Sequence, residues 1–162
     1  MVKVSGKGSG RVSIAGLVCF QPGRRASPPR LIYRTRTHRG RKGERRSFSE
    51  RDYADLLDAA HQRLGGPIVL IWDNLNTHIS HVMREYIAAR DWLTVYRLPP
   101  YAPDLNATEG VWANLTTGLG NRHFHGLDTL KATIKSQLRH MQYRPDLITG
   151  FLAHTGLPTE PT

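Results

Sequence analysis

Apolar positions along the chain change their period from one segment to the next, and each period predicts an element. Residues 11–20 are rich in β-branched and apolar side chains and predict a strand, and residues 30–37 alternate and predict a second one. Residues 50–64 place their apolar side chains on one helical face, with Ser49 as N-cap and an acidic residue at the capping-box position. Residues 68–72 are apolar without alternation, which predicts a strand covered on both faces.

The second half of the chain continues this α/β order. A stripe at helical spacing predicts an amphipathic helix between the strand at 68–72 and a strand at 93–98, which together form a parallel crossover. Two further helices follow residue 106. The apolar residues of the three stripes are Ile79, Val82, Met83, Tyr86 and Ile87; Trp112, Leu115 and Leu119; and Leu127, Leu130, Ile134, Leu138 and Met141, with Leu147, Ile148, Phe151 and Leu152 expected to close the core.

Positive charge is concentrated in the first third of the chain. Residues 1–51 hold 14 Lys and Arg against 2 Asp and Glu, whereas residues 52–162 hold 9 against 11. The densest block, residues 34–46, favours contact with the phosphates of a nucleic acid through counterion release. Such contacts position a protein on DNA without reading its sequence. A solvated basic loop without a specific partner accounts for the same composition.

Length and composition exclude several other classes of protein. The 162 residues suit one domain, and no apolar run approaches the roughly 20 residues of a membrane span. The first residues lack the apolar region of a signal peptide. The single cysteine, Cys19, excludes an internal disulfide framework, suits a reducing cytoplasm and is expected to be buried. The pairs His78/His81 and His123/His125 have no third clustered ligand for zinc.

Two carboxylates stand where a metal site is expected. Asp73 follows the apolar strand at 68–72, and ligand sites of open α/β sheets lie beyond the carboxyl ends of the strands. Glu109 lies in the first turn of the helix that follows Asn106. The two carboxylates can share a metal ion. Asn106 and Glu109 also match a plain capping box, which needs no chemistry.

The sequences around both carboxylates resemble the mariner-like DDE transposases, in particular their bacterial insertion-sequence branch. Residues 72–78 read WDNLNTH, similar to the family's hydrophobic strand that ends in Asp-Asn with a His a few residues later. Residues 98–112 read LPPYAPDLNATEGVW and match the family's second, longer motif nearly throughout. A departure is Ala107-Thr108, where the family usually has Pro and an apolar residue, so the first helical turn is expected to be weaker. The resemblance covers residues 10 to 155.

This resemblance implies an RNase H-like α/β fold, a mixed sheet flanked by helices, and metal-dependent cleavage and strand transfer of DNA in transposition. Asp73 and Glu109 would be catalytic and would hold Mg²⁺ or Mn²⁺, with a third carboxylate needed to complete a two-metal site for phosphoryl transfer. Double-stranded DNA, as transposon ends and target, would be the partner. Residues expected near the metal or DNA are Asn74, His78, Tyr101 and Asn106, and those expected on the DNA backbone are Arg34, Arg36, Arg39, Arg41, Lys42, Arg45, Arg46, Lys131, Lys135 and Arg139.

The family's fold begins with a strand that carries the first acidic residue, ahead of the strand at 11–20. No acidic residue precedes Glu44 in this chain, so we expect that strand, its carboxylate and the upstream helix-turn-helix region to be absent. The expected organisation is therefore a C-terminal part of a transposase. It has a basic lead at 1–10, an incomplete catalytic domain at 11–155 and a tail at 156–162.

Two functions of different classes remain open. One is a metal-dependent transposase domain that is weak or inactive by itself, and the other is a non-catalytic DNA-binding or assembly fragment that modulates a full-length transposase. Association with a second copy or with the full-length protein is expected, because an incomplete sheet exposes unpaired backbone groups. The expected location is the cytoplasm, at the bacterial nucleoid. His78 is equally well explained as a polar residue at a helix start. The stripe of Lys131, Lys135 and Arg139 is equally well explained as the solvated side of its helix.

Overall fold

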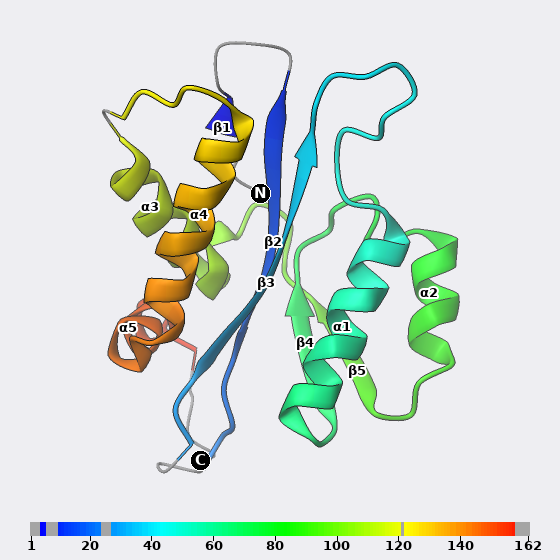
Figure 1. Ribbon diagram of the computed structural model, residues 1–162. Coiled ribbons are helices and arrows are strands. Elements are labelled where there is room, and N and C mark those ends of the chain that lie inside the picture. Colours follow the sequence, from blue (N-terminus) through cyan, green and yellow to red (C-terminus); the bar gives the residue numbers. More distant parts are fainter. Residues whose placement is uncertain (1–3, 6–9, 24–26, 121, 158–162) are drawn as a thin grey trace. The chain divides into compact units, whose positions relative to one another are not determined.

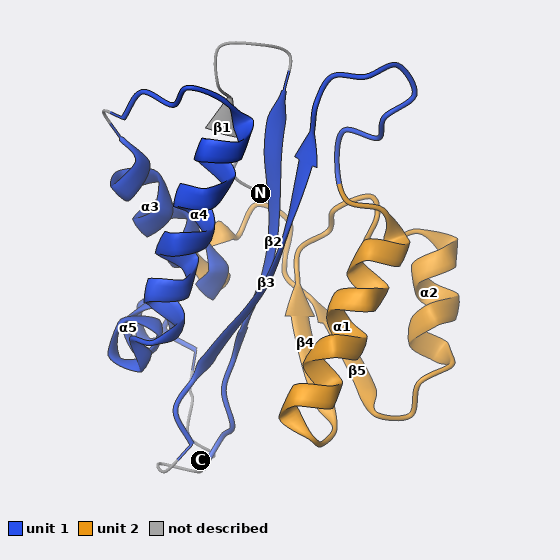
Figure 2. Cartoon of the chain, in the orientation of Figure 1, with its two compact units in different colours: residues 1–47, 107–162 blue, residues 48–106 orange. Residues whose placement is uncertain are grey.

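The computed structural model describes residues 4–5, 10–23, 27–120 and 122–157. The chain divides into two compact units, which Figure 2 colours separately. Unit 1 comprises residues 1–47 and 107–162, and unit 2 comprises residues 48–106. Each has its own sheet and its own helices. Along the part of the chain that the structure describes, no helix is long and apolar enough to cross a membrane.

The sheet of unit 1 is antiparallel, in the order β1-β2-β3. β2 (Arg11–Cys19) and β3 (Arg30–His38) pair along their whole length and confirm the strands predicted at 11–20 and 30–37. β1 (Val4–Ser5) pairs with the start of β2, on the edge away from β3. It was not predicted, because two residues are too short to show a period. The other residues of the predicted lead, 1–3 and 6–9, lie outside the described residues, as do residues 158–162 of the tail.

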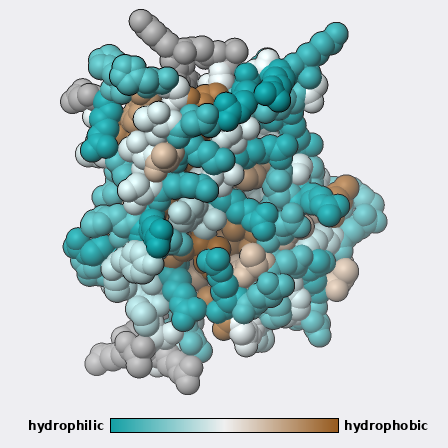
Figure 3. All heavy atoms as spheres, in the orientation of Figure 1, coloured by the Kyte–Doolittle hydropathy of each residue, from teal (hydrophilic) through white to brown (hydrophobic). Residues whose placement is uncertain are grey.

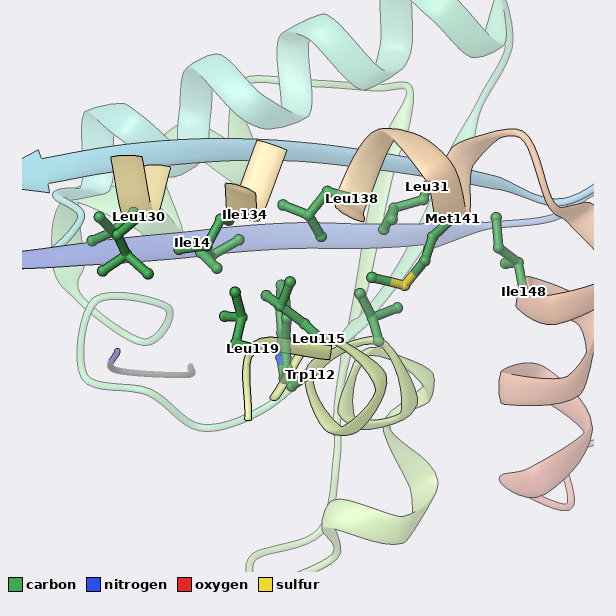
Figure 4. Packing of buried hydrophobic residues seen from close by; sticks show 12 residues of the cluster. Ile14, Leu31, Trp112, Leu115, Leu119, Leu130, Ile134, Leu138, Met141 and Ile148 are labelled. Atoms are coloured by element: carbon green, nitrogen blue, oxygen red, sulfur yellow. The ribbon is translucent and has the colours of Figure 1, made fainter. Parts of the chain in front are cut away.

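Three helices complete unit 1: α3 (Ala107–Leu119), α4 (Leu127–Gln142) and α5 (Pro145–His154). The predicted stripes of α3 and α4, and the residues expected to close the core, are buried or partly buried and meet one face of the β2–β3 pair (Figures 1 and 4). The latter residues lie on α5, which was not predicted as a separate helix. Gly16 permits this packing on β2, because a Cβ there would lie 3.0 Å from the Trp112 ring. The shared core consists of Val12, Ile14, Leu31, Val111, Trp112, Leu115, Leu119, Leu130, Ile134, Leu138, Met141 and Ile148.

Unit 2 alternates helices with a two-stranded parallel sheet, as the crossover pattern predicted. Ser49 and Asp52 form the predicted capping box at the start of its first helix, and Gly65 ends that helix in the left-handed conformation (φ 71°). The second helix begins later than its apolar stripe, because Ser80 caps it after Ile79. Its elements are α1 (Glu50–Leu64), β4 (Ile68–Trp72), α2 (His81–Ala88), β5 (Leu93–Arg97) and the short 3-10 turn η1 (Pro103–Leu105).

The prediction that β4 is covered on both faces was wrong. Leu70 and Trp72 are buried, but Val69 and Ile71 on the other face are 65% and 49% exposed. The unbroken apolar run therefore does not report the environment of both faces. Burial depends on which elements of the rest of the chain cover each face of the strand, and the sequence of five residues does not contain that information.

Candidate metal-binding and DNA-binding residues

Asp73 directly follows β4, at the carboxyl end of the parallel strand pair, as predicted. Its Oδ1 lies 2.8 Å from Nδ1 of His78 and accepts a hydrogen bond from the backbone N–H of Leu75 at 3.1 Å. The hydrogen bond from His78, followed by that from Leu75, holds the pKa of the Asp73 carboxyl below its ordinary value, although partial burial opposes the shift. Asp73 is therefore ionised at neutral pH, and its side chain is 55% exposed.

His78 is held in place by two aromatic rings. Its imidazole stacks on the indole of Trp72, with ring centroids 4.1 Å apart and an interplanar angle of 1°. Tyr53 of α1 meets the same imidazole edge-on, with centroids 4.6 Å apart. Burial, and then the charge of Asp73, raise the pKa of Tyr53 to about 12, so the phenol stays neutral. Tyr53, Trp72, Asp73 and His78 thus form one cluster within unit 2, which we name the Asp73 cluster.

Two other predicted residues of unit 2 have distinct surroundings. Asn74 donates from Nδ2 to the backbone carbonyl of Leu98 at 2.8 Å, which ties the segment after β4 to the segment after β5. Tyr101 is fully exposed and is the one non-glycine residue with a positive φ, 59°, among the residues that the structure describes. Asn74 therefore shapes the edge of the sheet that carries Asp73, whereas Tyr101 presents its ring to solvent.

Glu109 is the third residue of α3, directly after Ala107 and Thr108, and its side chain is exposed. Asn106 immediately precedes the helix, at the N-cap position. The buried residues Trp112 and Leu115 hold α3 against the core of unit 1 and so fix the helix that carries Glu109. Glu109 belongs to unit 1, whereas the Asp73 cluster belongs to unit 2.

The donor chemistry of the two carboxylates suits a hard divalent cation. Within the described residues no hydrogen bond engages Oδ2 of Asp73, so that oxygen is available as a ligand. Mg²⁺ prefers oxygen ligands, keeps several waters and is commonly held by one or two carboxylates together with substrate phosphates. No group of three or more His, Cys, Asp or Glu side chains that could hold a metal occurs in the described part of the chain. Asp73 thus fits Mg²⁺ or Mn²⁺ as one ligand among several.

The predicted DNA-contacting residues of the first third lie on β3 and on the basic loop, residues 39–46. The loop is organised by Glu44, whose Oε2 accepts the backbone N–H groups of Arg39 (2.9 Å) and Arg41 (3.2 Å). The buried His38 at the end of β3 contacts the backbone carbonyl of Glu44 at 3.2 Å. Because an internal carboxylate already occupies these backbone donors, contact with an external phosphate falls to the loop's cationic side chains.

The basic loop is joined to the cationic stripe of α4. The Arg39 guanidinium contacts Asp128, in the first turn of α4, at 2.7 Å. Lys131 follows Asp128 by one turn, and Lys135 and Arg139 continue along the same side of the helix. Both Lys135 and Arg139 are exposed, and Figure 3 shows hydrophilic residues over most of the face in view. We name residues 39–46 with these three side chains the basic surface; all of it lies in unit 1.

The fold matches solved structures of Mos1 transposase. The Mos1 catalytic domain with Raltegravir and Mg superposes with a TM-score of 0.57 at 14% identity, covering 97% of this chain and 81% of that one. The Mos1 paired-end complex with the left transposon end gives 0.53 at 14% identity, covering 91% and 54%, and the Mos1 strand transfer complex gives 0.51 at 14% identity, covering 91% and 53%. The chain spans about half the length of the Mos1 chains in these two complexes. Its fold is therefore RNase H-like, as expected.

The family follows from the sequence itself. Residues 35–131, well over half of the chain, match the model of the DDE superfamily endonucleases. This chain is a member of the DDE superfamily endonuclease family. The matched segment contains Asp73, Glu109 and the whole basic loop. A search of curated proteins found no match.

Sequence reasoning missed the residues that support the candidate site. By sequence, Tyr53 is only one apolar position of the helix at 50–64, and Trp72 is only the end of a strand. Glu44 is the first acidic residue of the chain, and nothing local indicates that it organises the basic loop. Trp72 could have been suspected because it adjoins Asp73, whereas no local signal links Tyr53 to a histidine 25 positions later.

Proposed function

We propose that this chain is the catalytic domain of a DDE transposase, in which Asp73 and Glu109 hold Mg²⁺ or Mn²⁺ for cleavage and strand transfer of DNA. The observation that supports the proposal is the ionisation and the fixed position of the Asp73 carboxylate in a member of this family. It is an ionised carboxylate at a strand end, fixed through Oδ1 and available through Oδ2. A divalent ion at such a site would stabilise the charge that develops on the oxygens of the transferred phosphoryl group.

The residues of the chain have separate tasks in this proposal. Asp73 and Glu109 are the metal ligands, and a third carboxylate is required for a two-metal site. Asn74 keeps the two strand ends of unit 2 together through Leu98. The motif at residues 98–112 supports an origin in a bacterial insertion sequence, and the domain would then act on DNA in the cytoplasm.

Double-stranded DNA is the proposed partner. The basic surface, together with Arg34 and Arg36 of β3, supplies cationic side chains for the phosphates and no evident means to read bases. Mos1 has been solved as a paired-end complex with a transposon end. By extension, we propose that this chain binds transposon ends and target DNA, and that it assembles with a second copy or with a full-length transposase.

Nicking of supercoiled plasmid in the presence of Mn²⁺ tests the catalytic proposal. We expect the parent chain to convert supercoiled DNA to the open circle only slowly, because two of the three carboxylates of a two-metal site are assigned, and we expect both Asp73→Asn and Glu109→Gln to lose this residual activity. Asp91→Asn is the matched control, because it removes one exposed carboxylate from the same unit as Asp73 without touching the Asp73 cluster.

The controls decide what a negative result means. Chelation of the metal should abolish nicking by the parent and by Asp91→Asn alike. Nicking that persists in Asp73→Asn would remove Asp73 from the catalytic role. If neither the parent nor Asp91→Asn nicks DNA while both are folded, cleavage by this chain alone is contradicted.

A non-catalytic DNA-binding or assembly role is the second candidate. It is favoured by the basic surface, whose cationic side chains can contact phosphates without a metal ion. In that case, DNA affinity should fall with added salt and be unchanged by Asp73→Asn and by chelation. Fluorescence anisotropy with labelled duplex DNA measures this and separates the two candidates.

A further inference from the structure

The Asp73 cluster contains one feature that packing does not explain. His78 is nine-tenths buried, and its Nε2 has no hydrogen-bond partner among the described residues. A buried polar atom without a partner destabilises the folded state, because the hydrogen bonds that it makes to water in the unfolded chain are lost and not replaced. An apolar ring of similar size would stack on Trp72 and meet Tyr53 without that cost. A nitrogen-bearing ring at this position therefore needs a reason other than stability.

The other ring nitrogen, Nδ1, explains why a histidine stands at this position. Nδ1 lies 2.8 Å from Oδ1 of Asp73 and 3.3 Å from the backbone carbonyl oxygen of the same residue. Both neighbours are acceptors, so Nδ1 carries the hydrogen and donates it. The N–H of Leu75 donates to the same Oδ1 at 3.1 Å. Two donors therefore hold one carboxylate oxygen, and Oδ2 is left for a different partner.

We propose that His78 is a positioning residue, which holds the Asp73 carboxylate through Oδ1 so that Oδ2 serves as the metal ligand. This inference rests on the proposed function, because it takes Asp73 as a ligand. The contacts with Trp72 and Tyr53 restrict rotation of the imidazole, so the hydrogen bond is pre-formed. Hydrogen bonds to a ligating carboxylate commonly contribute a factor of about 10–100 to metal affinity.

Two other roles for His78 agree less well with its surroundings. Direct contact with DNA is disfavoured because the side chain is buried and its Nε2 is inaccessible. Simple support of a helix start does not require the contact with Asp73, since Ser80 caps α2 through its own side chain. The contact with the Asp73 carboxylate is therefore the role that best explains His78.

Substitutions separate the ring from its donor. His78→Phe keeps an aromatic ring between Trp72 and Tyr53 but removes the donor. His78→Asn and His78→Leu form a matched pair of similar shape, and only Asn has a donor near the place of Nδ1. Mn²⁺ affinity, measured by electron paramagnetic resonance of the free ion, is the main readout and needs no DNA or turnover. Urea unfolding of each variant reports stability.

We expect His78→Phe to weaken Mn²⁺ binding by about 10–100-fold while its unfolding midpoint stays level or rises. His78→Asn should bind Mn²⁺ more tightly than His78→Leu, and this comparison decides the matter even if the Phe variant does not fold. Parent-like affinity in both His78→Phe and His78→Leu, with binding lost in Asp73→Asn, would overturn the positioning role alone. Equal Mn²⁺ binding by the parent and Asp73→Asn, or none by the parent, would instead overturn Asp73 as a ligand and the inference with it.

Discussion

Gly110, the residue next to Glu109 on α3, makes the sharpest test of how unit 1 packs. A Cβ at this position would lie 2.6 Å from Cδ1, 2.8 Å from Cγ and 3.0 Å from Cβ of Phe151 on α5. Carbon atoms in contact prefer a separation of about 3.5–4.0 Å. Because no side-chain rotation moves the Cβ of Phe151, α3 and α5 must shift apart to accept Gly110→Ala.

Two effects of opposite sign act in this substitution. Helix propensity alone would stabilise α3 by about 1 kcal/mol, whereas an extra carbon in a packed core costs about 1–3 kcal/mol. The three short contacts place the cost near the upper end of that range. We therefore expect Gly110→Ala to lower the free energy of unfolding by about 1–2 kcal/mol.

Urea unfolding, followed by tryptophan fluorescence, measures this difference. In a Phe151→Ala background the contacts with Cδ1 and Cγ are removed and only the 3.0 Å contact with Cβ remains. Gly110→Ala should therefore destabilise that background less than it destabilises the parent chain. Gly150→Ala is the matched control, since it lies inside α5 and its added Cβ would meet no atom within 4 Å. A Gly110→Ala chain at least as stable as the parent would refute the reasoning, because propensity alone would then account for it.

Three further substitutions test other parts of the chain. Burial raises the pKa of Asp58, but hydrogen bonds, led by that from Arg90, outweigh it and hold the pKa below its ordinary value. Asp58→Asn should therefore lower the free energy of unfolding by about 1–2 kcal/mol at pH 7, a value already reduced for the partial exposure of Asp58. That contribution is present above the unfolded pKa of about 4 and is lost as pH falls through the lower folded pKa, so urea curves whose difference is constant with pH would contradict it. Tyr101→Gly should raise stability by about 0.5–1 kcal/mol, because it relieves a left-handed residue whose ring makes no contact; a clear loss in thermal unfolding would show that the ring packs. Lys135→Ala should weaken DNA binding equally for all DNA sequences, and it should reduce the dependence of the binding constant on salt concentration by about one phosphate contact. If anisotropy titrations give the same salt dependence for the variant and the parent, Lys135 of α4 does not contact DNA.

Much of the fold was predicted because its causes are local. The capping box of Ser49 and Asp52 and the left-handed Gly65 that ends α1 act within a few residues of each other. The buried stripe of α4 recurs at a fixed helical spacing, and Pro145 marks where that helix must give way to the next. The position of Asp73 followed in the same way, since an apolar strand that meets a polar run is expected to end there.

The sequence by itself determined the order of most helices and strands, though not β1 or α5, together with the family and the two carboxylates proposed as metal ligands. Tertiary structure decided what surrounds those residues. Tyr53 contacts His78 across 25 positions of the chain, and Val69 remains exposed in a strand that the sequence predicted to be covered on both faces. Each of these depends on contacts between segments whose separation in the chain bears no fixed relation to their separation in space. Periods and caps report local geometry, whereas the orientation of a carboxylate and the exposure of a strand face are set by what packs beside them.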